Sequence, residues 1–115
     1  MDSIAKLNKR RAEIVRQIAA LPPMRRGTVS EQYLETVRKD GSRTKRGPYG
    51  VYTFKEKKKT LSRRLRDKAQ TQLYREQIDA FRRFQSLVAE LVEVGQALAD
   101  RTVAEAQQEK KRLRR

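Results

Sequence analysis

The last third of the chain constrains the fold most, because it predicts one helix that is too long for a small domain. From about Asp67 the sequence consists mainly of strong helix formers, and a wide apolar stripe runs through it at Leu73, Ile78, Phe81, Phe84, Leu87, Val88, Leu91, Val94 and Leu98. A continuous helix from Asp67 into the tail would be about 70 Å long at about 1.5 Å per residue. A compact domain of this chain length is narrower than that, so the helix needs a second surface along its stripe.

Residues 2–21 supply that surface as a second amphipathic helix. Asp2 and Ser3 are candidate N-caps, and the two prolines at 22 and 23 stop the helix. Its apolar residues recur at helical spacing, at Ile4, Leu7, Ile14, Ile18 and Leu21. The stripe from Phe81 to Leu98 has about the same length, so we predict an antiparallel helical hairpin. The long helix is expected over residues 67–110, and residues 108–115 form a basic tail.

Two helices cover only part of so broad a stripe. We therefore predict a homodimer that completes a four-helix, coiled-coil-like core through Phe81, Phe84, Val88, Leu91 and Leu98.

Residues 25–66 have the alternation of a basic β-meander. The stretch "TVSEQYLETVRK" predicts a first strand, and Lys39-Asp40-Gly41-Ser42 predicts a turn in which Asp and Gly both take positive φ. A second strand, "YGVYTFKE", follows Gly47-Pro48, and "KTLSRRL" is the third. The whole chain, residues 1–115, is thus predicted to be a single α+β domain: an N-terminal helix, a three-stranded antiparallel meander and a long C-terminal helix.

A two-residue loop at Lys57-Lys58 would fix the pairing of the second and third strands. Glu56 then faces Lys59, Phe54 faces Leu61, and Tyr52 faces Arg63. One face of the sheet is suited to a core. The other face collects hydroxyls, cations and one aromatic ring: Lys55, Thr60, Thr53, Ser62, Val51, Arg64 and Tyr49.

Positive charge is concentrated in this middle segment. The chain carries a formal charge of +15, and residues 38–68 hold thirteen Lys and Arg against three acids. Such self-repulsion is usually tolerated where a polyanion relieves it, so nucleic acid is the expected partner. The candidate binding residues are Arg43, Lys45, Arg46, Tyr49, Lys55, Lys57, Lys58, Lys59, Arg64 and Arg66.

DNA is favoured slightly over RNA, because a three-stranded sheet can lay one face into the major groove. Two alternatives stay open. The same charges could bind RNA or a ribosome, and the helices could instead form a protein interaction or oligomerisation module.

Catalysis is not expected. The chain contains neither cysteine nor histidine, which excludes disulfides, Cys/His zinc sites and imidazole chemistry, and its acids are scattered singly among bases. We expect no catalytic residues, no metal and no cofactor. No apolar run is long enough for a signal peptide or a membrane span, so a cytoplasmic protein is expected, associated with the nucleoid if it binds DNA.

Three stretches, "RRGTVSEQYLETVRKDGS", "RGPYGVYTFKEKKKTLSRRL" and "YREQIDAFRRFQSLV", resemble a family of short basic bacterial proteins grouped as a domain of unknown function. The resemblance covers about residues 25–95. Many members of that family carry a cysteine-rich loop before Gly-Pro-Tyr and occur near mobile-element genes. Here Asp40–Arg46 occupies the place of that loop without a cysteine, so no metal role carries over. The resemblance implies a bacterial, archaeal or phage setting and no particular activity.

Overall fold

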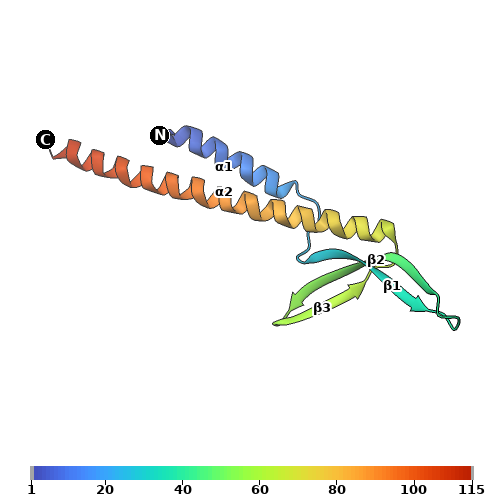
Figure 1. Ribbon diagram of the computed structural model, residues 1–115. Coiled ribbons are helices and arrows are strands. Elements are labelled where there is room, and N and C mark those ends of the chain that lie inside the picture. The colour runs from blue at the N-terminus through green and yellow to red at the C-terminus, as the bar shows by residue number, and fades with distance from the viewer. Residues whose placement is uncertain (1, 115) are drawn as a thin grey trace. The chain divides into compact units, whose positions relative to one another are not determined.

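The computed structural model describes residues 2–114 and has the predicted α+β element order (Figure 1). The elements are α1 (Ile4–Ala19), β1 (Thr28–Val37), β2 (Arg43–Glu56), β3 (Lys59–Arg64) and α2 (Lys68–Leu113). The chain divides into two compact units. One holds α1 with the part of α2 from Arg82 onward, and the other is Pro22–Phe81.

The first unit is the predicted antiparallel helical hairpin. Of the two candidate caps, Ser3 is the N-cap of α1, and its Oγ accepts a hydrogen bond from the Lys6 amide at 3.2 Å. The guanidinium of Arg10 donates to both carboxylate oxygens of Glu90 at 2.6 Å, whereas Leu7, earlier in α1, lines a groove with Ala97 of α2. The two helices therefore run in opposite directions, and the predicted hairpin is confirmed.

The α2 helix begins with a capping arrangement and continues past its predicted end. The Asp67 carboxylate accepts a hydrogen bond from the Gln70 amide at 2.8 Å, and the Gln70 side chain accepts one from the Arg66 amide at 2.6 Å. The helix extends to Leu113, so most of the predicted basic tail is helical, while Arg115 lies outside the described residues. Within the described chain, neither helix holds a stretch apolar enough to cross a membrane.

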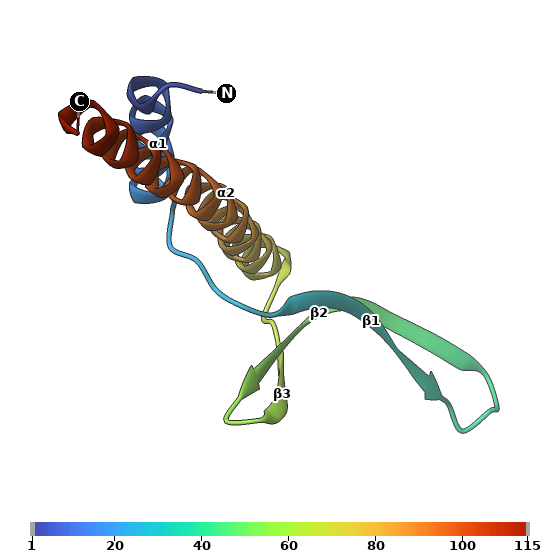
Figure 2. The same cartoon turned by 90° about the vertical axis from the view of Figure 1, so that its left-hand side faces the viewer.

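The second unit contains an antiparallel sheet with strand order β1-β2-β3. The predicted register of β2 with β3 is confirmed, because Glu56 pairs with Lys59 and the remaining partners follow from that pair. Only Val51–Thr53 of β2 pairs with both neighbouring strands. Residues 31–37 of β1 and 43–50 of β2 form a two-stranded ribbon that continues beyond β3 (Figure 2).

The β1–β2 turn differs from the prediction. The Arg38 amide donates to the Ser42 carbonyl at 2.8 Å, so three residues form the loop, and Gly41 alone takes positive φ (86°). The Asp40 carboxylate instead accepts hydrogen bonds from the amide and the hydroxyl of Ser42, at 3.0 and 2.6 Å. β2 begins at Arg43, directly after this turn, and not after Gly47-Pro48 as predicted.

The core of the second unit lies between one face of the sheet and the first turns of α2. It is formed by the buried side chains of Tyr52, Leu65, Tyr74 and Ile78, with Val29 and Phe54 packed against them. The ring of Tyr52 meets the ring of Tyr74 edge-on at 5.0 Å. Gly50 lies so close to Thr71 that an added Cβ would be 2.9 Å from the threonine methyl, so a glycine is needed there. We call this side of the sheet the core face.

Candidate nucleic-acid interface

The opposite side of the sheet, which we call the open face, follows directly from the strand register. Cα partners in a sheet project to the same side, so the pairs assign fourteen residues to this face. They are Thr28, Ser30, Gln32, Leu34 and Thr36 of β1, Thr44, Arg46, Tyr49, Val51, Thr53 and Lys55 of β2, and Thr60, Ser62 and Arg64 of β3. All fourteen are described, and none of their side chains is buried. The seven residues that the sequence assigned to this face are all among the fourteen, so this part of the prediction is confirmed. They are Tyr49, Val51, Thr53, Lys55, Thr60, Ser62 and Arg64.

A bulge in β2 brings Arg46 onto the open face. The register shifts between Gln32 and Leu34, where β2 contains one extra residue, at Gly47-Pro48. Gly47 has a φ of 128°, and an added Cβ would lie 2.9 Å from the Gln32 carbonyl oxygen. Strict alternation would place Arg46 on the core face with Gly50, and the bulge reverses this. The sequence reasoning missed the bulge, although a Gly-Pro pair inside a strand signals one.

Charges within the strands are sorted by face. The three strands contain three acidic residues, Glu31, Glu35 and Glu56, and all of them project to the core face, opposite Gly50, Lys45 and Lys59. The open face carries the three cations Arg46, Lys55 and Arg64 and no carboxylate. Among the ion pairs of the described residues, none involves these three cations.

The ten predicted binding residues do not share one surface. Four of them lie on the open face, namely Arg46, Tyr49, Lys55 and Arg64, and two form the β2–β3 turn, Lys57 and Lys58. Three project to the core face, Arg43, Lys45 and Lys59. The tenth, Arg66, follows β3. Arg43 approaches Glu35 at 3.8 Å, and the ammonium of Lys45 lies 6.0 Å from the ring of Tyr33.

An aromatic and a cation are stacked at the centre of the open face. The guanidinium carbon of Arg64 lies 3.7 Å from the centre of the Tyr49 ring. A shallow hollow of about 180 Å³ surrounds the pair and is lined by Gln32, Leu34, Tyr49, Val51, Ser62 and Arg64. The sequence reasoning did not single out Gln32 or Leu34, because the register of β1 was not predicted.

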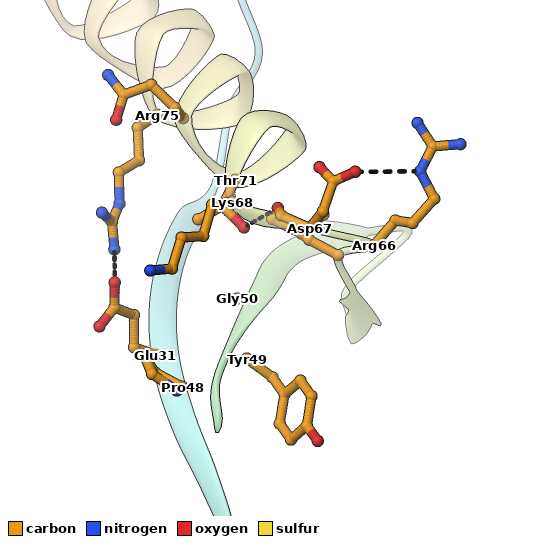
Figure 3. Close-up of a pocket in the computed structure, with 11 residues that line it drawn as sticks. Glu31, Pro48, Tyr49, Gly50, Arg66, Asp67, Lys68, Thr71 and Arg75 are labelled. Carbon is orange, nitrogen blue, oxygen red and sulfur yellow. Dashed lines mark hydrogen bonds and ion pairs between the residues drawn. The ribbon is translucent and has the colours of Figure 1, made fainter. Parts of the chain in front are cut away.

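A larger cleft of about 700 Å³ lies between the strands and the first turns of α2 (Figure 3). Its charges are largely paired. Arg75 approaches Glu31 at 3.2 Å, and Arg66 approaches Asp67 at 3.6 Å. Tyr49 lines this cleft as well as the hollow on the open face. Arg66 is thus placed apart from the open face and beside a carboxylate.

Comparison with known proteins gives no relative. No protein-family model matches this sequence, and no curated protein or solved structure is significantly similar to it. The resemblance to the family of short basic proteins, with its mobile-element setting, therefore stays a prediction.

Proposed function

We propose that this protein binds nucleic acid, with DNA favoured over RNA, and that it does so without catalysis, through the open face and the turn at Lys57 and Lys58. The observation that carries the proposal is the segregation of charge: every carboxylate of the strands projects to the core face, and the open face offers only cations, hydroxyls, amides and apolar groups. Hydroxyl and amide donors beside Lys and Arg are the groups that contact phosphate oxygens and sugars.

The backbone of the β2–β3 turn supports the same proposal. Lys57 and Lys58 both take positive φ, 49° and 68°, as a two-residue turn between twisted strands requires. Residues with a Cβ are disfavoured there by about 1–2 kcal/mol each, and Asn-Gly is the usual choice. A chain that retains two lysines at such positions gives up stability for charge at the tip of the hairpin. This is expected where the charge has a ligand.

The dimensions of the strands fit a duplex. A two-stranded β-ribbon is narrow enough to enter the major groove of B-form DNA. Along β2, Arg46 and Lys55 are at most about 30 Å apart at about 3.3 Å per residue, which is close to one turn of the double helix. The major groove of A-form RNA is deep and too narrow for side chains to enter, so the same face suits double-stranded RNA less well.

The experiment that tests the proposal compares two triple variants with the same change in net charge. One variant, R46Q/K55Q/R64Q, removes the cations of the open face. The matched control, R43Q/K45Q/K59Q, removes three cations that project to the core face. Binding of a labelled duplex of about 20 base pairs is measured by fluorescence anisotropy over a series of salt concentrations, with A-form RNA of the same sequence as competitor.

We expect the wild type to show a slope of about −4.5 for log affinity against log salt. The three open-face cations and the two turn lysines each contribute about −0.9 to this slope. The open-face variant should fall to about −1.8, and the control should stay near the wild-type value. Equal losses in both variants would mean that net charge, and not the open face, drives binding. Affinity that does not change with salt would refute nucleic-acid binding altogether, and tighter binding to the RNA would reverse the preference for DNA.

Self-association through α2 is a second proposal. Of the five residues predicted to form a homodimer, Leu98 is buried within the helical unit, and Phe81, Phe84, Val88 and Leu91 are partly buried. Val92 and Val103 are 61% and 58% exposed, and their spacing of eleven residues places them on one side of the helix. These two valines are the better candidates for a helix seam. Sedimentation of the wild type and of V92E/V103E would show whether a dimer forms there.

A further inference from the structure

Arg64 differs from the other cations of the open face because an aromatic ring holds its guanidinium. Its guanidinium carbon lies 3.7 Å from the centre of the Tyr49 ring, a cation–π stack. Tyr49 is itself half-buried in β2, and Val51, two residues further on, is the Cα partner of Arg64. In the described part of the chain, no hydrogen bond or ion pair engages the N–H groups of this guanidinium. Arg64 therefore has a fixed plane and unused donors.

We propose that Arg64 is a specificity-determining residue that recognises guanine in the major groove, and this inference rests on the proposed function. A phosphate contact needs chiefly a positive charge, and a mobile lysine supplies one as a point charge. Recognition of a base edge needs a planar fork of donors at a fixed position, because guanine presents two acceptors, O6 and N7, side by side. Stacking on Tyr49 fixes the plane of the fork and leaves its N–H edge available.

The hollow around Arg64 contains the other groups that distinguish bases. Gln32 is the Cα partner of Tyr49, and glutamine pairs with the N6 and N7 atoms of adenine. Leu34 and Val51 line the same hollow, and apolar side chains contact the thymine methyl group. The ligand is thus a short duplex segment in which a G·C pair lies beside A·T pairs.

Arg46 and Lys55 lack this arrangement. Both are exposed, and neither is stacked on a ring in the described residues. They are suited to phosphates. The matched control is the same chemical change off this face, Arg43→Lys, since Arg43 projects to the core face.

The test is selection of bound duplexes from a random library at about 150 mM salt, followed by affinity measurements on the enriched site and on a site with its guanine pair replaced. We expect the wild type to prefer the guanine site by about 10- to 100-fold. Arg64→Lys should reduce this preference to less than about 3-fold with an unchanged salt slope, because the charge is kept. Arg43→Lys, the same change at a residue that projects to the core face, should keep both the preference and the slope.

Changes to the ring test the same idea independently. Tyr49→Phe retains the ring and should retain the preference, whereas Tyr49→Leu removes the stack and should lower it. If Arg64→Lys does not fold, this second pair decides the question. An unchanged preference in Arg64→Lys or in Tyr49→Leu would overturn the inference. Salt-dependent binding without any base preference would overturn it too, and the proposed function would stand; absence of salt-dependent binding would refute the proposed function itself.

Discussion

Replacing the two turn lysines by Asn-Gly should strengthen the fold and weaken DNA binding at the same time. In the wild type, Lys57 and Lys58 have φ values of 49° and 68°, a region in which a Cβ is disfavoured. Glycine removes this penalty at the second position, and asparagine tolerates the region better than lysine at the first. We expect K57N/K58G to raise the free energy of unfolding by about 1–2 kcal/mol.

The same change removes two of the five cations that we place at the interface, which are the three of the open face and the two turn lysines. The salt slope should therefore move from about −4.5 to about −2.7. A control variant, K57R/K58R, retains both charges and both Cβ atoms, so neither stability nor slope should change much. Opposite signs of the two effects are the signature of a turn selected for its charge.

Both quantities can be measured on the full chain. All four tyrosines lie within Pro22–Phe81, so tyrosine fluorescence during urea unfolding reports on the unit that contains the sheet. Anisotropy on labelled duplex DNA gives the slope. A K57N/K58G variant that binds with the wild-type slope would show that the turn does not contact phosphates. A loss of stability would show that the lysines are not strained, and the reasoning from φ would fail.

Three further outcomes follow from local contacts. Gly50→Ala should cost about 1–3 kcal/mol by urea unfolding because its Cβ would collide with Thr71, and Thr71→Ala should offset part of that loss in a double-mutant cycle. The hydrogen bonds from Ser42 lower the pKa of Asp40. The ionised carboxylate therefore stabilises the turn at pH values above its ordinary pKa, and this stabilisation is lost as the pH falls through the lowered pKa. Ser42→Ala should raise that pKa in an NMR titration. Gly95→Ala should stabilise α2 by about 1 kcal/mol in thermal unfolding, since its Cβ would meet no atom within 4 Å.

The sequence predicted the β2–β3 hairpin well because two independent signals agreed there. Alternation fixed the faces, and the short charged turn at Lys57-Lys58 fixed the register. The pairing of β1 with β2 could not be predicted in the same way. Its loop length depends on the hydrogen bonds that the Asp40 carboxylate accepts from Ser42, and its faces depend on the bulge at Gly47-Pro48. One extra residue in a strand changes which side chains share a face, and alternation alone does not reveal it.

The helices show the same limit in another form. Apolar spacing and two prolines were enough to predict α1 and its antiparallel partner. The end of α2 was harder to locate, because the polar residues beyond Arg101 have good helix propensity but no stripe. Which of the stripe residues are buried also could not be derived from spacing, since Leu98 and Leu73 belong to the same predicted stripe and are 8% and 52% exposed.

A count of charge in the sequence overstates the charge that a sheet can present to one ligand. Neighbouring cations in a strand project to opposite faces, so Lys45 and Arg46 separate, and Arg63 and Arg64 separate likewise. The guanidinium of Arg63 donates to the Tyr74 hydroxyl at 3.2 Å, on the core side. Nine of the ten predicted residues are cationic, and if all nine neutralised phosphates the salt slope would be about −8. The partition by face predicts about −4.5, so one salt titration of the unmodified protein distinguishes a patterned surface from a diffuse one.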